Sequence, residues 1–385
     1  MKKISFFYLI ILFAFALNGF SQDITLSEID NYNDWGKKAL VVNNSIIELV
    51  IFPEIGGRVL YYGFPDDEYL AVNESEMDKT YDADTDGTGP WKSWGYGGYK
   101  VWPAPQSVWN WPPPPHLDWG NYNFTVEHES PDSVIIFLES EEENLRAPGL
   151  VFTRRFKAYK GSTKVTIEQT IINNNSSAQN WSVWDVTQAV VNHSDNNDYS
   201  NFSVYFPANK SEFITGPAYG DLDDEVTQIN DEISMFKYNS SKTHAKLFCY
   251  LENGWECFTD ERDKQSYIKH FPSLAGNHPD EGANFEIYSG GGYIEIEVLS
   301  PITNIAGNGG EYTYTQNWYA TKTNGAVQNV NHAAVVNEYL SFNSETSNIT
   351  GAYGIITSGS LKLRFLDSSG EELELSEAIP VYSSM

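Results

Sequence analysis

The feature that most constrains the fold is a long series of short, strand-like runs separated by turn residues. Clusters of Gly, Asn, Asp, Ser and Pro divide these runs, and few segments have the apolar spacing of an amphipathic helix. Such a pattern predicts an all-β fold, namely a large antiparallel β-sandwich. The sequence shows no repeat of fixed period, which argues against propellers and solenoids. The runs are residues 46–52, 134–138, 150–156, 164–172, 181–190, 246–251, 266–271, 285–288, 293–299, 313–321, 353–356 and 361–365.

Charge and composition narrow the class of partner. The chain of 385 residues has a formal net charge of −28, which repels nucleic acid and anionic lipid surfaces. Aromatic residues make up 15% of the chain, and aromatic rings beside amides and carboxylates are typical of proteins that bind carbohydrate. The seven histidines show no metal-ligand spacing, and no phosphate loop or dinucleotide fingerprint is present. The sequence therefore predicts a carbohydrate ligand, no metal and no cofactor, and leaves the oligomeric state open.

The first 21 residues have the layout of a secretory signal peptide. Lys2 and Lys3 precede an apolar run that is short for a membrane span, and Gly19-Phe-Ser21 resembles a cleavage site. We therefore expect a secreted or periplasmic protein with no membrane insertion after cleavage. The mature chain is expected to form a sandwich over residues 22–336, and residues 337–385 to form its last strands or a small appended β module.

The two cysteines leave a disulfide open. Cys249 and Cys257 flank Asn253-Gly254, a strong signal for a hairpin turn. A three-residue turn places the two cysteines opposite each other, whereas a two-residue turn pairs Cys249 with Phe258. Because a one-residue slip exchanges the faces of a strand, the sequence does not decide between these registers.

Two polar, irregular segments are candidates for a binding site. Residues 78–98 are rich in Gly and Asp and read as a long loop. Residues 102–119 hold six prolines and four tryptophans, a composition that predicts neither regular strand nor helix. Proline-stiffened aromatic rings with interleaved polar groups suit a sugar subsite, although the same rings also suit a plug packed on the sandwich. The candidates here are Lys100, Trp102, Gln106, Trp109 and His116.

Two strand-like runs carry unexpected polar residues. In residues 181–188, alternation sends Trp184 and Gln188 to one face and Asp185 and Thr187 to the other. Buried polar groups need partners, so this polar set is either a hydrogen-bonded strut or a site wall.

The second such run is residues 293–299. Glu295 and Glu297 share one face, and Ile294, Ile296 and Val298 share the other. The carboxylates either face solvent or line a concave surface, where neighbouring like charges would raise a pKa into a range useful for acid–base chemistry.

Several segments, in this order, resemble the galactose mutarotase-like (aldose 1-epimerase-like) superfamily, and are closest to a secreted branch of it. The resemblance covers roughly residues 40–320. The segments that carry it are Pro53-Glu-Ile-Gly-Gly-Arg-Val-Leu60, Gly98-Tyr-Lys-Val-Trp-Pro-Ala-Pro-Gln106, Trp184-Asp-Val-Thr-Gln188, Glu286-Ile-Tyr288, Tyr293-Ile-Glu-Ile-Glu297 and Trp318 after Gly309-Gly-Glu-Tyr312.

The resemblance implies a β-supersandwich with a concave sugar-binding face. In mutarotases a histidine acts as general acid and a glutamate as general base, and Glu297 matches the glutamate. The chain departs from the pattern after Thr187, where Gln188-Ala189 replaces the family's Asn-His pair. An amide cannot exchange a proton as imidazole does, so the general acid would have to come from elsewhere, with His116 and His270 as candidates.

Three classes of function follow. The leading prediction is carbohydrate binding on the concave face. The alternatives are a carbohydrate-active enzyme, either a mutarotase or a lyase-like enzyme on an acidic polysaccharide, and a non-catalytic scaffold. Substrate-binding candidates beyond those already named are Arg58 and Lys269, which, with Lys100 and His270, would supply the cations that a lyase needs.

Overall fold

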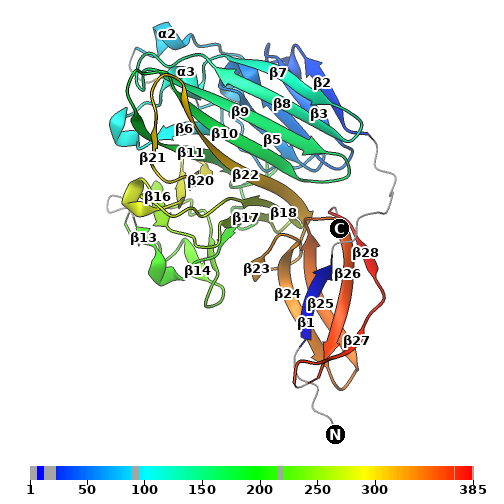
Figure 1. Ribbon diagram of the computed structural model, residues 1–385. Helices are drawn as coiled ribbons and strands as arrows, with labels where there is room; N and C mark the ends of the chain where they lie inside the picture. Colours follow the sequence, from blue (N-terminus) through cyan, green and yellow to red (C-terminus); the bar gives the residue numbers. More distant parts are fainter. Residues whose placement is uncertain (1–6, 13–22, 89–94, 216–219, 368, 384–385) are drawn as a thin grey trace.

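The computed structural model describes residues 7–12, 23–88, 95–215, 220–367 and 369–383. Strands account for 49% of the described residues and helices for 8%, so the all-β prediction is confirmed. Two large antiparallel sheets lie face to face, and a smaller group of C-terminal strands projects from one end of them (Figure 1). This is the large sandwich that the turn-separated strands predicted, in the supersandwich form that the resemblance implied.

The first large sheet has ten strands. In spatial order these are β14 (Val226–Gln228), β15 (Ser234–Phe236), β12 (Phe202–Phe206), β17 (Trp255–Asp260), β18 (Gln265–His270), β22 (Gly310–Lys322), β10 (Val165–Asn173), β9 (Leu150–Tyr159), β8 (Ser133–Ser140) and β7 (Tyr122–Glu129).

The second large sheet has eleven strands and carries the candidate site. In spatial order these are β13 (Ile214–Thr215), β16 (His244–Cys249), β19 (Phe285–Gly290), β20 (Tyr293–Leu299), β11 (Gln179–Val190), β6 (Tyr99–Ala104), β5 (Arg58–Gly63), β4 (Glu48–Phe52), β3 (Ala39–Asn43) and β2 (Thr25–Ile29), with β21 (Thr303–Ile305) paired to β11.

Helical elements are short and lie in the connections. The α-helices are α1 (Glu74–Met77), α2 (Ala83–Asp86) and α3 (Pro115–Asp118). The 3₁₀ turns are η1 (Tyr32–Asp34), η2 (Pro53–Ile55), η3 (Gln106–Val108), η4 (Lys210–Glu212) and η5 (Asp280–Gly282). None of the helices among the described residues has the length and apolar character needed to cross a membrane.

The proline-rich segment was predicted to be irregular, and that prediction was wrong at both of its ends. Its start belongs to β6, a strand in the middle of the second sheet, in which Pro103 lies opposite Val183 of β11. Its end forms α3, which begins at Pro115, a first-turn position where proline's missing N–H costs nothing. Only the stretch between them, which includes η3, is without regular strand or helix.

The Asn253-Gly254 turn is not the hairpin that its sequence suggested. Cys249 ends β16 in the eleven-stranded sheet, and Cys257 lies in β17 of the ten-stranded sheet, so the turn passes the chain from one sheet to the other. Both cysteines are free and buried. Neither register considered from the sequence therefore applies.

The C-terminal strands form two further sheets. The three-stranded sheet contains β23 (Asn329–Val330), β24 (Ala334–Asn343) and β25 (Asn348–Ile355), and the four-stranded sheet contains β1 (Phe7–Leu12), β26 (Gly359–Leu366), β27 (Glu372–Leu375) and β28 (Ile379–Val381). The boundary expected at residue 337 falls inside β24. Of the expected signal peptide, residues 1–21, only 7–12 are among the described residues, where they pair with β26; export stays a prediction.

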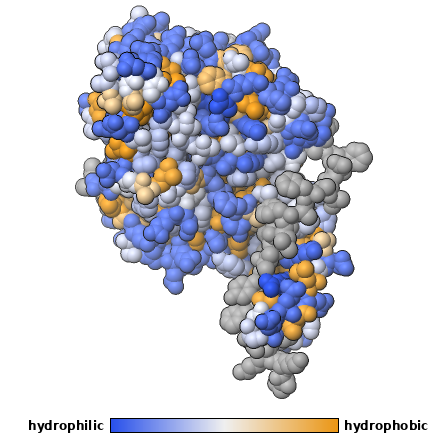
Figure 2. Space-filling model, viewed as in Figure 1, coloured by the Kyte–Doolittle hydropathy of each residue, from blue (hydrophilic) through white to orange (hydrophobic). Residues whose placement is uncertain are grey.

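The main core fills the space between the two large sheets. Ile294, Ile296 and Val298 of β20 are fully buried there, as the alternation of that strand predicted. The face of the molecule seen in Figure 2 is largely hydrophilic, with scattered apolar side chains. The other face of the eleven-stranded sheet, turned away from this core, carries a cavity.

Candidate functional site

A cavity of about 940 Å³ lies on the eleven-stranded sheet, on the side away from the sandwich core. Its floor comes from the central strands and its walls from the connections around them. Strand residues that line it are Arg58, Lys100, Trp102, Trp184, Gln188, His244, Lys246, Phe248, Glu286, Tyr288, Tyr293, Glu295 and Glu297. Connecting segments add Ala71, Val72, Asn73, Gly95, Gly97, Gln106, Trp111, Pro113, Asp118, Asp280, Gly291 and Gly292.

Strand register brings the charged side chains of the floor together. Glu297 of β20 lies opposite Glu286 of β19, and Glu295 lies opposite Tyr288. On the other edge of β20, Glu295 pairs with Gln188 of β11. Side chains directly opposite on one face of an antiparallel pair are close neighbours, so this register alone gathers three carboxylates.

The deepest part of the cavity holds a carboxylate–lysine–carboxylate trio. Lys246 Nζ lies 2.6 Å from Glu286 Oε2 and 2.8 Å from Glu297 Oε1. The indole Nε1 of Trp184 donates to the other oxygen of Glu297, Oε2, at 2.7 Å. Glu286 and Glu297 are both about 1% exposed, so these charges are held almost entirely by one another.

Burial and mutual attraction shift the pKa values of all three groups. Desolvation raises the pKa of Glu297 and, more strongly, the pKa of Glu286, against the opposing attraction of Lys246. Desolvation alone would lower the pKa of Lys246, but the attraction of the two glutamates more than offsets it and the pKa is raised. The arrangement therefore keeps Lys246 charged and favours the protonated form of one of the two carboxyl groups.

Two further ion pairs form the opposite wall. Arg58 Nη2 lies 2.8 Å from Asp118 Oδ1, which also accepts a 2.8 Å hydrogen bond from the indole Nε1 of Trp102. Lys100 Nζ lies 3.4 Å from Glu295 Oε1 and 4.3 Å from the ring centroid of Trp102. Among the cavity residues that the structure describes, each lysine and arginine thus has a carboxylate partner.

Eight of the predicted site residues line this one cavity. They come from four strands and the η3 turn, and the order of the strands in the sheet, rather than their order in the chain, brings them together. These residues are Arg58, Lys100, Trp102, Gln106, Trp184, Gln188, Glu295 and Glu297.

Three other candidates lie in the interior instead. Lys269 of β18 donates from Nζ to Asp185 and, at 2.6 Å, to Thr187 Oγ1, a buried strut between the two sheets. Trp318 is 1% exposed and packs against core tyrosines. Trp109 is buried below the cavity wall, and its Nε1 donates to the carbonyl of Pro103 at 2.6 Å.

The two histidines proposed as general acids are also away from the cavity. His116 is buried in α3, with its Nδ1 3.4 Å from Glu143 Oε2. His270 lines a separate cavity of about 1190 Å³ near β23, where burial and the neighbouring His332 lower its pKa to about 4. Ala189, which stands in place of the family's histidine, is buried in the core.

The sequence analysis missed Lys246, Glu286 and His244 as site residues. His244, Lys246 and Phe248 alternate along β16, so a half-buried strand was visible in the sequence, but the Asn253-Gly254 turn assigned that strand to the wrong partner. His244 Nδ1 lies 2.5 Å from the hydroxyl of Tyr288. The cavity therefore contains a histidine, although on a different strand from the one that the resemblance suggested.

Comparisons with known proteins place the fold. No family model matches the sequence, and no curated protein matches it. Solved structures with the same architecture include a galactose mutarotase-like protein from Clostridium acetobutylicum, with 11% identity and a TM-score of 0.51 over 78% of this chain and 99% of that one. An aldose 1-epimerase candidate from Klebsiella pneumoniae has 9% identity and a TM-score of 0.52 over 77% and 82% of the two chains.

A mutarotase candidate from Salmonella typhimurium has 11% identity and a TM-score of 0.50 over 82% of this chain and 97% of its own. At these identities the similarity concerns the fold. The fold expected from the sequence is confirmed: this chain has the β-supersandwich of the galactose mutarotase-like proteins.

Proposed function

We propose that the chain binds a carbohydrate in the cavity of the eleven-stranded sheet. The observation that carries this proposal is the convergence of aromatic rings, amides and carboxylates on one concave surface. Trp102, Trp111 and Trp184 offer ring surfaces, and Gln106 and Gln188 offer amide groups beside the floor. Sugar rings present C–H faces to such rings and hydroxyl groups to such polar groups, and similar folds in mutarotase-like proteins support the same ligand class.

The charge pattern favours a neutral sugar. Five acidic residues and three basic residues line the cavity, and each basic side chain is paired: Arg58 with Asp118, Lys100 with Glu295, and Lys246 with two glutamates. A uronate would have to displace one of these carboxylates at a cost in desolvated charge. Since Lys269 and His270 lie elsewhere, the cations that a lyase needs are not gathered here, and the lyase alternative loses support.

Proton transfer on a bound sugar is the second candidate. Glu286 and Glu297, whose pKa values are raised by burial, and His244 in the same cavity supply groups that can donate or accept a proton. In a mutarotation, one group would take the proton of the anomeric hydroxyl while another protonates the ring oxygen. We assign the base role to Glu297 and the acid role to His244 or Glu286.

The decisive variant is Glu297→Gln, which preserves shape and leaves Lys246 its pair with Glu286. We expect binding of a neutral monosaccharide, measured by isothermal titration calorimetry across a panel of sugars, to weaken by about 1.5–3 kcal/mol, the range for hydrogen bonds to charged groups. Glu311→Gln, an exposed strand position on β22, is the matched control and should bind as the unmodified protein does.

Anomer exchange measured by nuclear magnetic resonance separates the two candidates. If the protein is an enzyme, Glu297→Gln should abolish most of the exchange rate above the uncatalysed rate. If it is only a binding protein, neither form should accelerate exchange. Failure of every sugar in the panel to bind would favour the scaffold alternative.

We further propose that the protein acts outside the cytoplasm. Support comes from the Lys2-Lys3 start, the apolar run and the Gly19-Phe-Ser21 sequence. Mass spectrometry of protein made in its native host should find an amino terminus near Gln22. Cytoplasmic protein that retains Met1 would contradict this proposal.

A further inference from the structure

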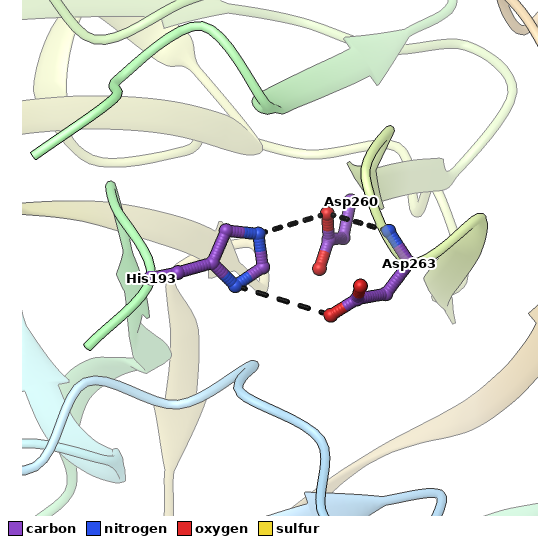
Figure 3. Close-up of side chains that lie close together, drawn as sticks. All are labelled: His193, Asp260 and Asp263. Atoms are coloured by element: carbon purple, nitrogen blue, oxygen red, sulfur yellow. Dashed lines mark hydrogen bonds and ion pairs between the residues drawn. The ribbon is translucent and has the colours of Figure 1, made fainter. Parts of the chain in front are cut away.

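At one end of the sandwich, three connections bring a histidine and several carboxylates together. His193 follows β11, Asp260 ends β17, and Asp263 lies in the turn to β18 (Figure 3). One potential ligand atom from each of these residues lies within 4.8 Å of the others. Glu68, from the connection after β5, adds a fourth group, with its Oε2 3.7 Å from His193 Nδ1.

Asp260 fixes the tautomer of the imidazole. Its Oδ1 lies 3.2 Å from His193 Nε2 and also accepts the backbone N–H groups of Arg262 and Asp263. An oxygen that already accepts two hydrogen bonds is an acceptor for the third, so Nε2 carries the proton. The lone pair of the neutral imidazole is then on Nδ1.

The Nδ1 atom has no hydrogen-bond partner. His193 is 1% exposed, and Nδ1 is among the buried polar atoms without a partner. It faces Glu68 Oε2 at 3.7 Å and Asp263 Oδ2 at 4.0 Å. Two carboxylates facing Nδ1 require positive charge there, either a proton on the ring or a cation between the groups, and Asp260 Oδ2 is a further buried oxygen without a partner.

We propose that these residues bind a divalent first-row metal ion, with His193 Nδ1, Glu68 and Asp263 as ligands and Asp260 as the positioning residue. A carboxylate behind a metal-ligating imidazole is the recurrent arrangement in protein metal sites. One imidazole with carboxylates suits Zn²⁺ or Mn²⁺, whereas Ca²⁺ prefers oxygen ligands alone. The sequence predicted no metal, because the ligands come from segments far apart in the chain and show no local spacing.

The two distances from His193 Nδ1 need only a small adjustment, whereas Glu68, whose Oε2 also accepts from the backbone N–H of Ser194, lies outside the group of ligand atoms within 4.8 Å of one another and must move toward Asp263. Ligand atoms about 2.0–2.2 Å from a tetrahedral metal lie roughly 3.3–3.6 Å from one another. Glu68 and Asp263 are a few tenths of an ångström beyond that range from Nδ1, and both are on connections with partly exposed side chains. Arg262, which pairs with Asp195 and with Asp263, would have to yield its contact to Asp263.

Equilibrium dialysis of the chelator-treated full chain against Zn²⁺ and Mn²⁺ tests the proposal, with metal counted by mass spectrometry. We expect one ion per chain for at least one of the two metals, together with a rise in Tm when the metal is added. His193→Gln and Asp263→Asn should each weaken binding at least tenfold. Asp260→Asn should weaken it roughly 10–100-fold, the usual effect of losing a positioning carboxylate.

Two variants keep the result interpretable. Asp263 is 42% exposed and in a turn, so Asp263→Asn tests the site even if the buried His193→Gln variant fails to fold. His128→Gln removes an exposed histidine of β7 and should leave binding unchanged. No stoichiometric binding of either metal, or binding that is unchanged in Asp263→Asn, would overturn the proposal and assign His193 as an imidazolium paired with its carboxylates.

Discussion

At the residue scale, the site depends on which face of a strand each side chain takes. The opposite faces of β20 were predictable, because its apolar and acidic residues alternate without exception from Ile294 to Val298. The partner of Glu297 was not predictable. Lys269, Lys100 and Arg58 were the expected cations, yet Lys246 is the partner, because sheet order rather than residue type decides which charges meet.

Glu256 is a buried carboxyl group without a hydrogen-bond partner, so its ionised form is unfavourable in the folded protein. It is fully buried in β17, and neither carboxyl oxygen has a hydrogen-bond partner. Desolvation raises its pKa to about 8, with Lys269 opposing and Asp185 reinforcing the shift. The folded protein therefore retains a proton that the unfolded chain loses above its ordinary pKa.

We expect this group to make the protein less stable as pH rises from about 4.5 to about 8. Within that window a single retained proton costs up to about 1.4 kcal/mol of unfolding free energy per pH unit. Glu256→Gln removes the titration, so urea unfolding at several pH values should give a flatter profile for the variant. Parallel profiles for the two proteins would contradict the assignment.

Variants of Gln106 and Trp102 distinguish an effect on sugar binding from an effect on stability. Trp102 is 3% exposed and donates to Asp118, so Trp102→Ala should lower the unfolding free energy by about 3–5 kcal/mol. Gln106 is partly exposed at the cavity wall, so Gln106→Ala should change stability by no more than about 0.5 kcal/mol. Sugar titrations should nevertheless show weaker binding for Gln106→Ala; normal affinity would place the ligand elsewhere in the cavity.

At the scale of elements, the strands were largely visible in the sequence and their assignment to sheets was not. Alternating and continuous apolar runs marked β9, β10, β11 and β20 because one or both faces of these strands are buried. The Asn253-Gly254 turn, by contrast, has local hairpin chemistry but joins strands of different sheets. Packing between the sheets therefore overrode the local turn preference. Because β16 was assigned to the wrong partner strand, its lysine, Lys246, was missing from the predicted site.

Because β16 and β17 lie in different sheets, we expect Cys249 and Cys257 to remain free thiols. Cys249 and Cys257 are 2% and 0% exposed, and burial raises the pKa of the Cys249 thiol to about 12. We expect neither thiol to react with a disulfide reagent in the native protein and two thiols per chain to react in denaturant. Reduction should leave Tm unchanged; a drop in Tm on reduction would indicate a disulfide after all.

At the scale of the whole molecule, the C-terminal strands are attached through a small apolar cluster. Residues near β23–β25 pack against β12, β17, β18 and β22 of the ten-stranded sheet. The cluster contains Tyr205, Ile233, Trp255, Cys257, Ile268, Tyr319, Val327, Val330, Val335 and Ile356. This contact couples the stability of the three-stranded sheet to that of the sandwich.

Ile356→Ala tests that coupling. Ile356 is fully buried in the cluster, so the variant should lower the unfolding free energy by about 2–5 kcal/mol and leave a single thermal transition. Ile379→Ala, at a position 50% exposed in β28, is the control and should change stability by less than about 0.5 kcal/mol. A separate low-temperature transition in the Ile356 variant would show that the C-terminal strands unfold on their own.

Strand β11 joins the two sides of the eleven-stranded sheet. On one face of β11, Trp184 and Gln188 donate hydrogen bonds to the glutamates of the cavity. On its other face, Asp185 and Thr187 accept hydrogen bonds from Lys269 of the opposite sheet. Any slide of this strand to suit a different ligand would break both sets of contacts together. The floor therefore behaves as a rigid template, and adaptation to ligands of different size is left to the connecting segments around Gln106, Trp111 and Gly291.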